Sequence, residues 1–513
     1  MKRSGILTVL LFTAALLTAQ NQSDTEKNKA SDSSNTTSYK KRVLESTEVD
    51  LLTSIYAQDG ENAAVTGGIG TEKLSDFATD INVSIPLNDD DVLTIDGTIS
   101  AYTSASSSNL NPFFSSTTSS GGTAVSGASS SGRGGGGRPG HGSDSGTTTT
   151  TTSSIGSPWV ASSGASRSDV WKSGTISYSH TSDDRNTMYS GQISAAREYD
   201  YGSFGAGLGI SRQLNQKNTE IGLKANVYLD HWFPEYPTEI KTFVTNGGNL
   251  NTDYFSGVDI LDASGSVIDK TGVDVWNPVK DYLITTDKRN TYALSLSFSQ
   301  IISKNAQLSI FSDLILQKGW LSNPMQRVYF ADRDNFYIGN ASSIDNYTDP
   351  SNGSVFQLAD DIERLPGSRL KIPIGLRYHQ YLNERLVFKT YYRYYFDDWG
   401  VQAHTVQLEL PVKLGDHFTL YPNYRYYTQT AAKYFAPYEE HLSTEEYYTS
   451  DYDLSAFNAH QYGLGIQYTD IFTKGHIGNF GLKNLSLNYS MYNRSTGLKA
   501  GIVTLGAKFV LDK

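Results

Sequence analysis

The sequence predicts an all-β fold, a transmembrane antiparallel β-barrel of about 16 strands with long extracellular loops and short periplasmic turns. Polar and apolar side chains alternate over many runs, and a period of two places them on opposite faces of a strand. The runs are about 10–13 residues long, whereas soluble strands are most often about 5–6 residues and a tilted transmembrane strand needs about 9–11. Several runs carry Lys, Arg or Glu at mid-strand, which a water-filled lumen permits.

The clearest runs cover residues 370–378, 386–396, 406–414 and 418–426. One face of each run is largely apolar or aromatic, and we expect the other face to line the lumen. The charged residues of this second face are Lys371, Arg377, Lys389, Arg393, Glu409, Lys413 and Arg425. In a channel, their net positive charge favours anionic solutes or sets a field across the lumen. A lumen closed by salt bridges and folded-in loops is the alternative.

The composition is compatible with this fold and excludes other classes. Hydrophobic residues make up 38% of the 513 positions and the mean hydropathy is -0.40. Beyond the N-terminus no apolar run is long enough for a membrane-spanning helix. The absence of cysteine excludes disulfides, thiolate metal sites and a lipoprotein anchor. The net charge of -11 argues against nucleic acid as a partner.

The N-terminus has the pattern of a secretory signal peptide over residues 1–19. Lys2 and Arg3 precede an apolar stretch, and a small residue, Ala19, ends it. Residues 20–47 are predicted to be a flexible polar periplasmic leader, and residues 48–513 the barrel. Export by such a signal places the protein in the outer membrane of a Gram-negative bacterium, with the lipid bilayer as its surroundings.

The remaining strands are predicted in order along the chain. They cover residues 49–57, 77–85, 93–101, 170–179, 187–197, 204–213, 220–232, 292–302, 307–320, 460–469, 486–493 and 498–511. Residues 104–168 form a low-complexity Ser/Gly/Thr loop, and long loops cover 233–289, 321–368 and 430–458. Each long loop follows an odd-numbered strand, so a chain that starts in the periplasm places all of them outside. The inward turns are short, apart from residues 470–481.

The end of the last strand and three prolines inside strands depart from a regular strand pattern. The end of the last strand, residues 504–511, resembles the terminal signal read by the outer-membrane assembly machinery, although the chain continues to Asp512 and Lys513. Pro373, Pro411 and Pro422 lie inside predicted strands, where each removes a ladder donor. We expect bulges to absorb them.

Several patterns suggest chemistry. Glu439, Glu440, His441, Asp451 and Asp453 crowd one external loop and are candidate ligands for a divalent cation, although acidic external loops are commonly only solvated. The glycines of residues 67–70 lack the Gly-Lys-Ser/Thr of a phosphate loop and are expected to serve positive φ angles. His404, near Asp397 and Asp398, is the best candidate for a hydrolytic centre, but no nucleophile motif accompanies it.

Six stretches resemble the domain-of-unknown-function 3570 family of bacterial outer-membrane β-barrels. They are residues 64–72 (AVTGGIGTE), 163–167 (SGASR), 197–204 (REYDYGSF), 393–400 (RYYFDDWG), 426–435 (YYTQTAAKYF) and 447–452 (YYTSDY). The resemblance implies an outer-membrane barrel and brings no established activity or catalytic residue. Genes of this family are thought to lie often near those of periplasmic flavin-transfer proteins, which hints at an envelope redox or metal context.

These observations favour a porin-like or transport-accessory barrel that passes or binds small solutes, gated by the loops at 233–289 and 321–368. Sixteen strands leave a lumen wide enough for water and small solutes. The alternative is a non-conducting structural barrel that displays its external loops or anchors an envelope partner, and a hydrolase around His404 comes third. We expect no enzymatic activity and no cofactor.

Overall fold

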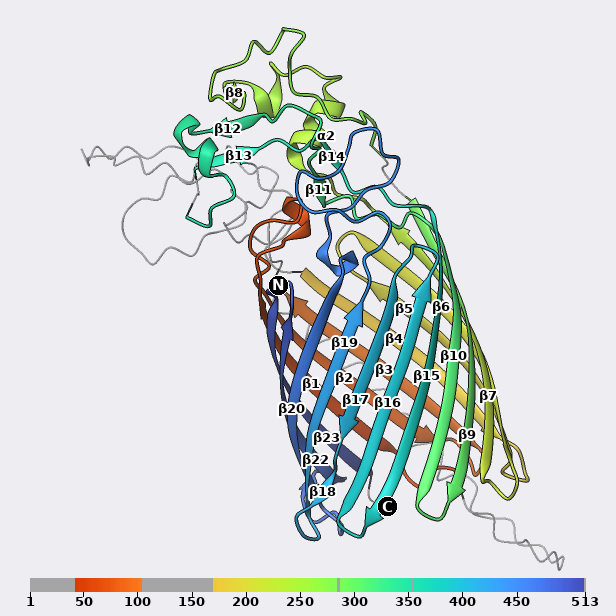
Figure 1. Cartoon of the computed structure of the whole chain (residues 1–513). Coiled ribbons are helices and arrows are strands. Elements are labelled where there is room, and N and C mark those ends of the chain that lie inside the picture. Colours follow the sequence, from red (N-terminus) through yellow and green to blue (C-terminus); the bar gives the residue numbers. More distant parts are fainter. Residues whose placement is uncertain (1–41, 104–168, 284–286, 352–353, 512–513) are drawn as a thin grey trace, which may run out of the picture. The chain divides into compact units, whose positions relative to one another are not determined.

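The computed structural model describes residues 42–103, 169–283, 287–351 and 354–511. Its main element is a closed antiparallel barrel of 16 strands (Figure 1). The strands are β1 (Glu48–Asp59), β2 (Leu74–Pro86), β3 (Asp91–Tyr102), β4 (Asp169–Thr181), β5 (Thr187–Arg197), β6 (Tyr201–Leu214), β7 (Thr219–Trp232), β9 (Asp287–Ser303), β10 (Ala306–Gly319), β15 (Ser368–Asn383), β16 (Leu386–Asp397), β17 with β18 (Gln402–Glu409 and Val412–Lys413), β19 (Phe418–Gln429), β20 (Phe457–Thr469), β22 (Phe480–Arg494) and β23 (Lys499–Leu511).

The barrel closes because its first and last strands pair with each other. β1 and β23 are antiparallel from Glu48 opposite Val510 to Asp59 opposite Lys499, and every other strand pairs with its neighbours in the sequence. Closure leaves no strand edge without partners, which a membrane-spanning sheet requires. The predicted strand number and order are confirmed.

The three strand prolines are accommodated without the bulges that we expected. The pairing of β15 with β10 keeps one register from Ile374 to Lys371 and only omits the pairs at Pro373. β17 and β18 keep one register against β16 on either side of Pro411, which interrupts the strand. The carbonyl oxygens remain in use, because that of Pro422 accepts from the Leu410 amide at 3.1 Å. Each proline therefore costs ladder bonds and does not shift the register.

Alternation gives the barrel two different faces. The outer face presents large apolar side chains to the surroundings, among them Ile176, Leu208, Leu296, Leu408, Leu464 and Leu487. An apolar surface of this extent is matched by lipid and not by water. The inner face carries polar, charged and tyrosine side chains. None of the helices in the described part of the chain has the length and apolar character needed to span a membrane.

The long and short connections lie at opposite ends of the barrel, as the alternation of odd and even strands predicts (Figure 1). The long loops begin and end within three residues of the predicted bounds, at 233–286, 320–367 and 430–456. The long inward turn after β20 contains a short strand, β21 (His476–Ile477), which pairs with the start of β22. The predicted signal peptide, the leader up to residue 41 and the loop 104–168 lie outside the described residues.

Most of the buried apolar core lies in the external loops and not in the barrel. We call residues 60–73, 233–283, 320–367 and 430–456, within the described part, the external cap. The cap contains η1 (Ala64–Thr66), α2 (Thr238–Thr245), η2 (Asp253–Phe255), β8 (Ile260–Leu261), β11 (Arg327–Val328), β12 (Tyr337–Gly339), η3 (Ala341–Asn346), β13 (Val355–Gln357), β14 (Asp361–Ile362) and η4 (Tyr452–Leu454). Its largest cluster surrounds Phe255, Trp276 and Leu358, all with at most 1% of their surface exposed.

All four loops contribute to the apolar packing of the cap. Ile69 of the first loop and Tyr438 of the fourth pack against a cluster that contains Leu261 and Tyr337 of the other two. The first loop approaches Tyr329 of the third loop closely because Gly67, at φ 78°, has no side chain. A Cβ there would lie 2.5 Å from the ring of Tyr329. The expected positive φ angles of residues 67, 68 and 70 are confirmed.

Candidate functional site

The inner faces of β15 to β19 bring most of the predicted lumen residues onto one wall. A cavity of about 490 Å³ is lined by Arg377, Lys389, Glu409 and Arg425, together with His379, Thr390, Tyr391 and Gln407. A second cavity, of about 320 Å³, is lined by Arg393 and again Arg425. Lys371 and Lys413 lie on the same face of their strands, toward the external and periplasmic ends, and line neither cavity. We call this surface the arginine wall.

Arg377 stacks on aromatic rings and has no carboxylate partner among the described residues. Its guanidinium carbon lies 4.9 Å from the centroid of Phe311 and 5.7 Å from that of Tyr391, distances at which a ring face attracts a cation. The two rings stack at 5.9 Å. Phe311 lies against β15 because residue 375 is a glycine. A Cβ at this position would lie 2.1 Å from the ring. The rings fix the position of Arg377 and leave its charge uncompensated.

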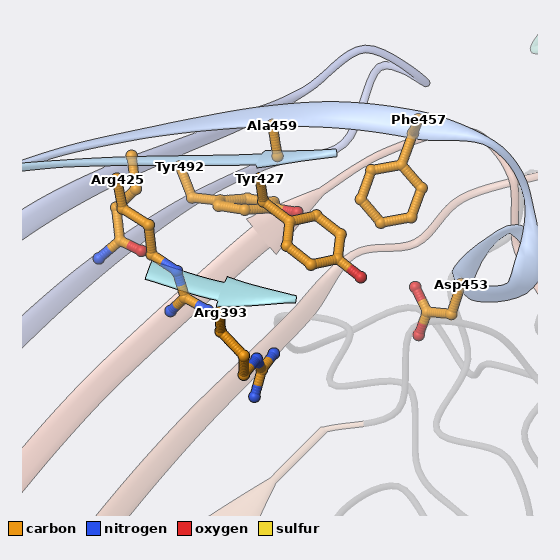
Figure 2. Close-up of a pocket in the computed structure, with 8 residues that line it drawn as sticks. Arg393, Arg425, Tyr427, Asp453, Phe457, Ala459 and Tyr492 are labelled. Carbon is orange, nitrogen blue, oxygen red and sulfur yellow. The ribbon is translucent and has the colours of Figure 1, made fainter. Parts of the chain in front are cut away.

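The smaller cavity lies at the external end of the arginine wall. Figure 2 shows Arg393 and Arg425 beside Tyr427 and Tyr492, with Asp453 on the adjoining loop. The Nε atom of Arg393 is buried and has no hydrogen-bond partner in the described part of the chain. An unsatisfied cationic donor is costly to bury. A polar or anionic ligand in this cavity would satisfy it.

Asp453 connects this cavity to the cap. Its carboxylate accepts from Nη1 of Arg494 at 2.6 Å, and the Arg494 guanidinium also bonds to the carbonyl oxygen of Tyr452. The guanidinium carbon lies 3.8 Å from the centre of the Phe457 ring. The sequence pattern predicts Asp453 as a metal ligand and gives no role to Arg494. The one signal for Arg494 in the sequence is its position just after a predicted strand, 486–493.

The charges of Lys389 and Glu409 cancel on the arginine wall. Nζ of Lys389 lies 2.8 Å from Oε1 of Glu409, across the pairing of β16 with β17. Arg369 and Asp397 form a similar pair at 2.5 Å near the external end. Within the described residues, Arg377, Arg393 and Arg425 have no carboxylate within ion-pair distance, unlike these two cations.

An acidic surface faces the arginine wall across the barrel. Asp76 and Asp80 on β2 and Asp96 on β3 share the inner face, where Asp80 accepts from Thr98 at 2.7 Å and Asp76 from Ser100 at 2.6 Å. In the described residues these carboxylates have hydroxyl or amide partners and no cation. β2 is eight strands from β15 in the closed order, half of the barrel's circumference.

The structure does not gather the five candidate metal ligands into one site among the described residues. Both ring nitrogens of His441 face oxygen atoms, the Glu445 carboxylate at 2.6 Å and the Thr449 carbonyl at 3.0 Å, so neither points toward the other candidate ligands. Glu439 accepts from Asn335 at 2.6 Å. No group of three potential metal-binding side chains forms among the residues described. Glu440 and Asp451 are likewise not gathered with His441.

His404 faces outward from β17 and not into the lumen. Its Nδ1 lies 2.8 Å from the hydroxyl of Tyr392, and its ring packs 5.0 Å from that of Tyr394. His460 and Tyr424 form the same arrangement two strands away, also at 2.8 Å. The nearby Asp397 instead binds Arg369 and the Val401 amide. The surroundings of His404 are those of an aromatic girdle at a membrane surface.

Burial perturbs three carboxyl groups in the cap. Desolvation raises the pKa of Glu363 to about 8, helped by the nearby Asp451. Burial likewise raises the pKa of Asp451 to about 6, with the negative charge of Asp453 as the next cause, and that of Asp360 to about 7. These groups tie cap segments together, since Glu363 accepts from Thr449 at 2.6 Å and from the Asn323 amide at 2.6 Å.

Comparison with solved structures finds long but weak likenesses. A bacterial polysaccharide outer-membrane secretin is 7% identical, covering 91% of this chain and 98% of its own, with a TM-score of 0.39. The toluene transporter TodX of Pseudomonas putida is 8% identical, covering 92% of this chain and 90% of its own, with a TM-score of 0.33. OpdK of Pseudomonas aeruginosa with vanillate is 8% identical, covering 91% of this chain and 98% of its own, also with a TM-score of 0.33. Such values are too low to transfer a ligand or an activity.

Comparison with a family profile shows which family the chain belongs to. No curated protein matches the sequence. A family profile described as "Protein of unknown function (DUF3570)" matches residues 8–500. Five of the six stretches on which the resemblance rests lie wholly or partly in external connections of the barrel, at 64–72, 197–204, 393–400, 426–435 and 447–452. The match spans nearly the whole chain, and the protein therefore belongs to the DUF3570 family.

Proposed function

We propose that this protein is an outer-membrane channel through which small anionic solutes pass along the arginine wall. The observation that carries the proposal is the absence, in the described residues, of any carboxylate partner for Arg377, Arg393 and Arg425. Where the described residues supply no carboxylate, water and a mobile anion can compensate these charges. Rings of Arg and Lys are the usual lining of anion-selective pores.

The acidic surface on β2 and β3 supports the same function. With Asp80 and Asp96 on one side and the arginines on the other, a field runs across the lumen. Anions travel along one wall and are repelled from the other, and a dipolar solute is oriented as it passes. The field is strongest at low ionic strength, since the Debye length is only about 8 Å at 0.15 M salt.

Location in the outer membrane follows from the same features, as part of this proposal. The apolar outer face, the closed ladder and the long loops at one end suit a Gram-negative outer membrane. Export by residues 1–19, insertion by the outer-membrane assembly machinery through the last strand, and an envelope partner belong to the same expectation.

Bilayer recordings test the proposal. The protein is refolded in a planar bilayer, and the reversal potential is measured under a KCl gradient. We expect stable open steps with anion preference. Replacing Arg393 and Arg425 together by Gln should move the selectivity toward cations, whereas Arg385→Gln should not, because Arg385 is exposed in the turn between β15 and β16. Cation preference in the unaltered protein would overturn the proposal.

A non-conducting barrel that displays its external cap is the second candidate. The observation that favours it is the packed core of the cap, with Phe255 and Trp276 completely buried. Loops that only connect strands have no need of such a core. A correctly folded barrel that never conducts, even after deletion of cap residues 320–367, would favour this function and exclude the first.

A further inference from the structure

A further pocket lies on the inner face beside the arginine wall, because β10 of the pocket pairs with β15 of the wall, and it has a different chemistry. It is formed by the external ends of β4 to β7, β9 and β10, and its volume is about 330 Å³, at the lower end of the range of about 300–1,000 Å³ for ligand sites. Its lining includes Trp171, Thr175, Ser194, Tyr201, Tyr228, Asp230 and Arg289. We call it the aromatic pocket.

Aromatic rings give this pocket its broad surfaces. The half-exposed ring of Trp171 stacks on Tyr201, with centroids 5.6 Å apart and planes 24° apart. Tyr201 is buried, so it supports Trp171 from behind. Tyr228 lies against Gly205, where a Cβ would be 2.7 Å from Cδ1 of Tyr228 and 2.3 Å from Oγ of Ser194. A side chain at position 205 would displace the ring, and glycine keeps it in place.

Among the described residues, the charged side chains that line the pocket are Asp230 and Arg289, which neutralise each other. Nε of Arg289 lies 3.1 Å from Oδ2 of Asp230, and the other oxygen of Asp230 accepts from Ser203 at 2.8 Å. The guanidinium of Arg289 is also held between Tyr201 and Trp232, at 5.4 and 5.2 Å from their ring centroids. The pair is largely buried on the Asp230 side. The pocket therefore carries no net charge, in contrast to the arginine wall.

Hydroxyl groups surround the rings. Those of Ser173, Thr175 and Ser194 face the lumen and have no hydrogen-bond partner in the described residues. Thr291 and Gln317 add a further hydroxyl and an amide to the lining. Gly205, Gly207 and Gly209 share the inner face of β6, so this part of the wall has no side chains of its own projecting into the lumen. A ligand rich in hydroxyl groups can replace water at these positions.

From this combination we propose that the aromatic pocket binds neutral saccharides. The C–H face of a pyranose is weakly positive and suits the negative face of Trp171 or Tyr228, while its hydroxyls meet the donors and acceptors between the rings. An anion finds no uncompensated cation here, and an apolar solute would leave the hydroxyls without partners. The site goes beyond anion passage and does not depend on ion conduction.

Calorimetric titration tests the proposal on the full-length protein, folded in detergent, with maltotriose as the probe. We expect binding in the millimolar range, about -4 kcal/mol, and quenching of tryptophan fluorescence. Trp171→Leu and Tyr228→Leu should each weaken binding about tenfold or more, and Gly205→Ala should weaken it by displacing Tyr228. Tyr189→Leu, an exposed outward-facing tyrosine on β5, is the matched control and should bind normally.

The outcomes separate this inference from the proposed function. Binding that is lost in Trp171→Leu and kept in Arg393→Gln supports a saccharide site distinct from the arginine wall. No heat with maltotriose, cellobiose or glucose, or equal binding in Trp171→Leu and Tyr228→Leu, overturns it even if the protein conducts anions. Folding of each variant is confirmed by heat-modifiable migration in gels. A barrel that binds maltotriose but never conducts would refute the channel and leave this site standing.

Discussion

Glu239 and Arg327 form a two-point ion pair that is completely buried in the external cap. Nε and Nη2 of the arginine lie 2.7 and 3.1 Å from the two carboxylate oxygens, and neither side chain has any exposed surface. Nη1 of Arg327 donates to the carbonyl of Val65 at 3.0 Å. One arginine therefore joins three loops that follow β1, β7 and β10. The charge of Glu239 raises the pKa of Arg327 further above its usual value, against desolvation.

Replacing Arg327 by Met should open the cap and leave the barrel intact. The substitution keeps the volume but strands the Glu239 charge in an apolar core, and loss of one partner of a buried pair costs roughly 3–5 kcal/mol. Hydrogen exchange should show lost protection over α2 and β11 with unchanged protection in β1 to β7.

The matched control is Lys241→Met, which removes an ion pair with Glu235 at the cap surface. An exposed pair contributes about 0–1 kcal/mol, so protection should barely change. Equal effects of the two substitutions would show that Arg327 does not hold the cap together.

The sequence predicts the barrel far better than the cap, for a physical reason. Strand faces follow a local period of two. This pattern predicts β5 at its observed bounds and places Arg377, Arg393 and Arg425 on one face. Residues that pair over long distances in the sequence follow no such period. Glu239 lies 88 positions from Arg327, and Asp453 was grouped with His441 because of its position in the chain, whereas its charge pairs with Arg494. The aromatic pocket was missed for the same reason, since its rings come from β4, β6 and β7.

The ion pair of Lys389 with Glu409 should tune selectivity in two directions. Glu409→Gln leaves Lys389 without a carboxylate and adds an uncompensated cation to the arginine wall, so anion preference should rise. Lys389→Gln frees Glu409 and should lower it. Reversal potentials under a salt gradient measure both changes. The half-exposed pair contributes little to stability, so both variants should fold, and shifts of the same sign would exclude the proposed lumen assignment.

Gly375→Ala should narrow the lumen beside Arg377. The new methyl group would lie 2.1 Å from the ring of Phe311, which must swing away from the strand into the lumen. We expect lower single-channel conductance and weaker anion preference, because Arg377 loses a stacking partner. Adding Phe311→Ala to this variant should restore the conductance. Gly97→Ala is the control, since a Cβ there meets nothing within 4 Å.

Raising the pH should loosen the junction between cap residues 320–367 and 430–456. Burial raises the pKa of Glu363 from 4.5 to about 8, so the folded cap holds a proton that the unfolded chain releases. The stabilisation is fully present below about pH 4.5 and is lost as the pH rises through about 8. The negative charge of Asp451 also raises the pKa of Glu363. Burial raises the pKa of Asp451 itself to about 6, so its ionisation at higher pH destabilises the same junction.

Hydrogen-exchange protection factors measured between pH 5 and 9 test this dependence, because they correct for the chemical effect of pH on exchange. Protection of residues 447–452 should fall across this window in the unaltered protein. Glu363→Gln resembles the protonated carboxyl group and can still accept from the Asn323 amide, so protection should stay high and vary much less with pH. The hydroxyl of Thr449 can turn to accept from the new amide. An unaltered pH dependence in Glu363→Gln would assign the effect to Asp360 or Asp451 instead.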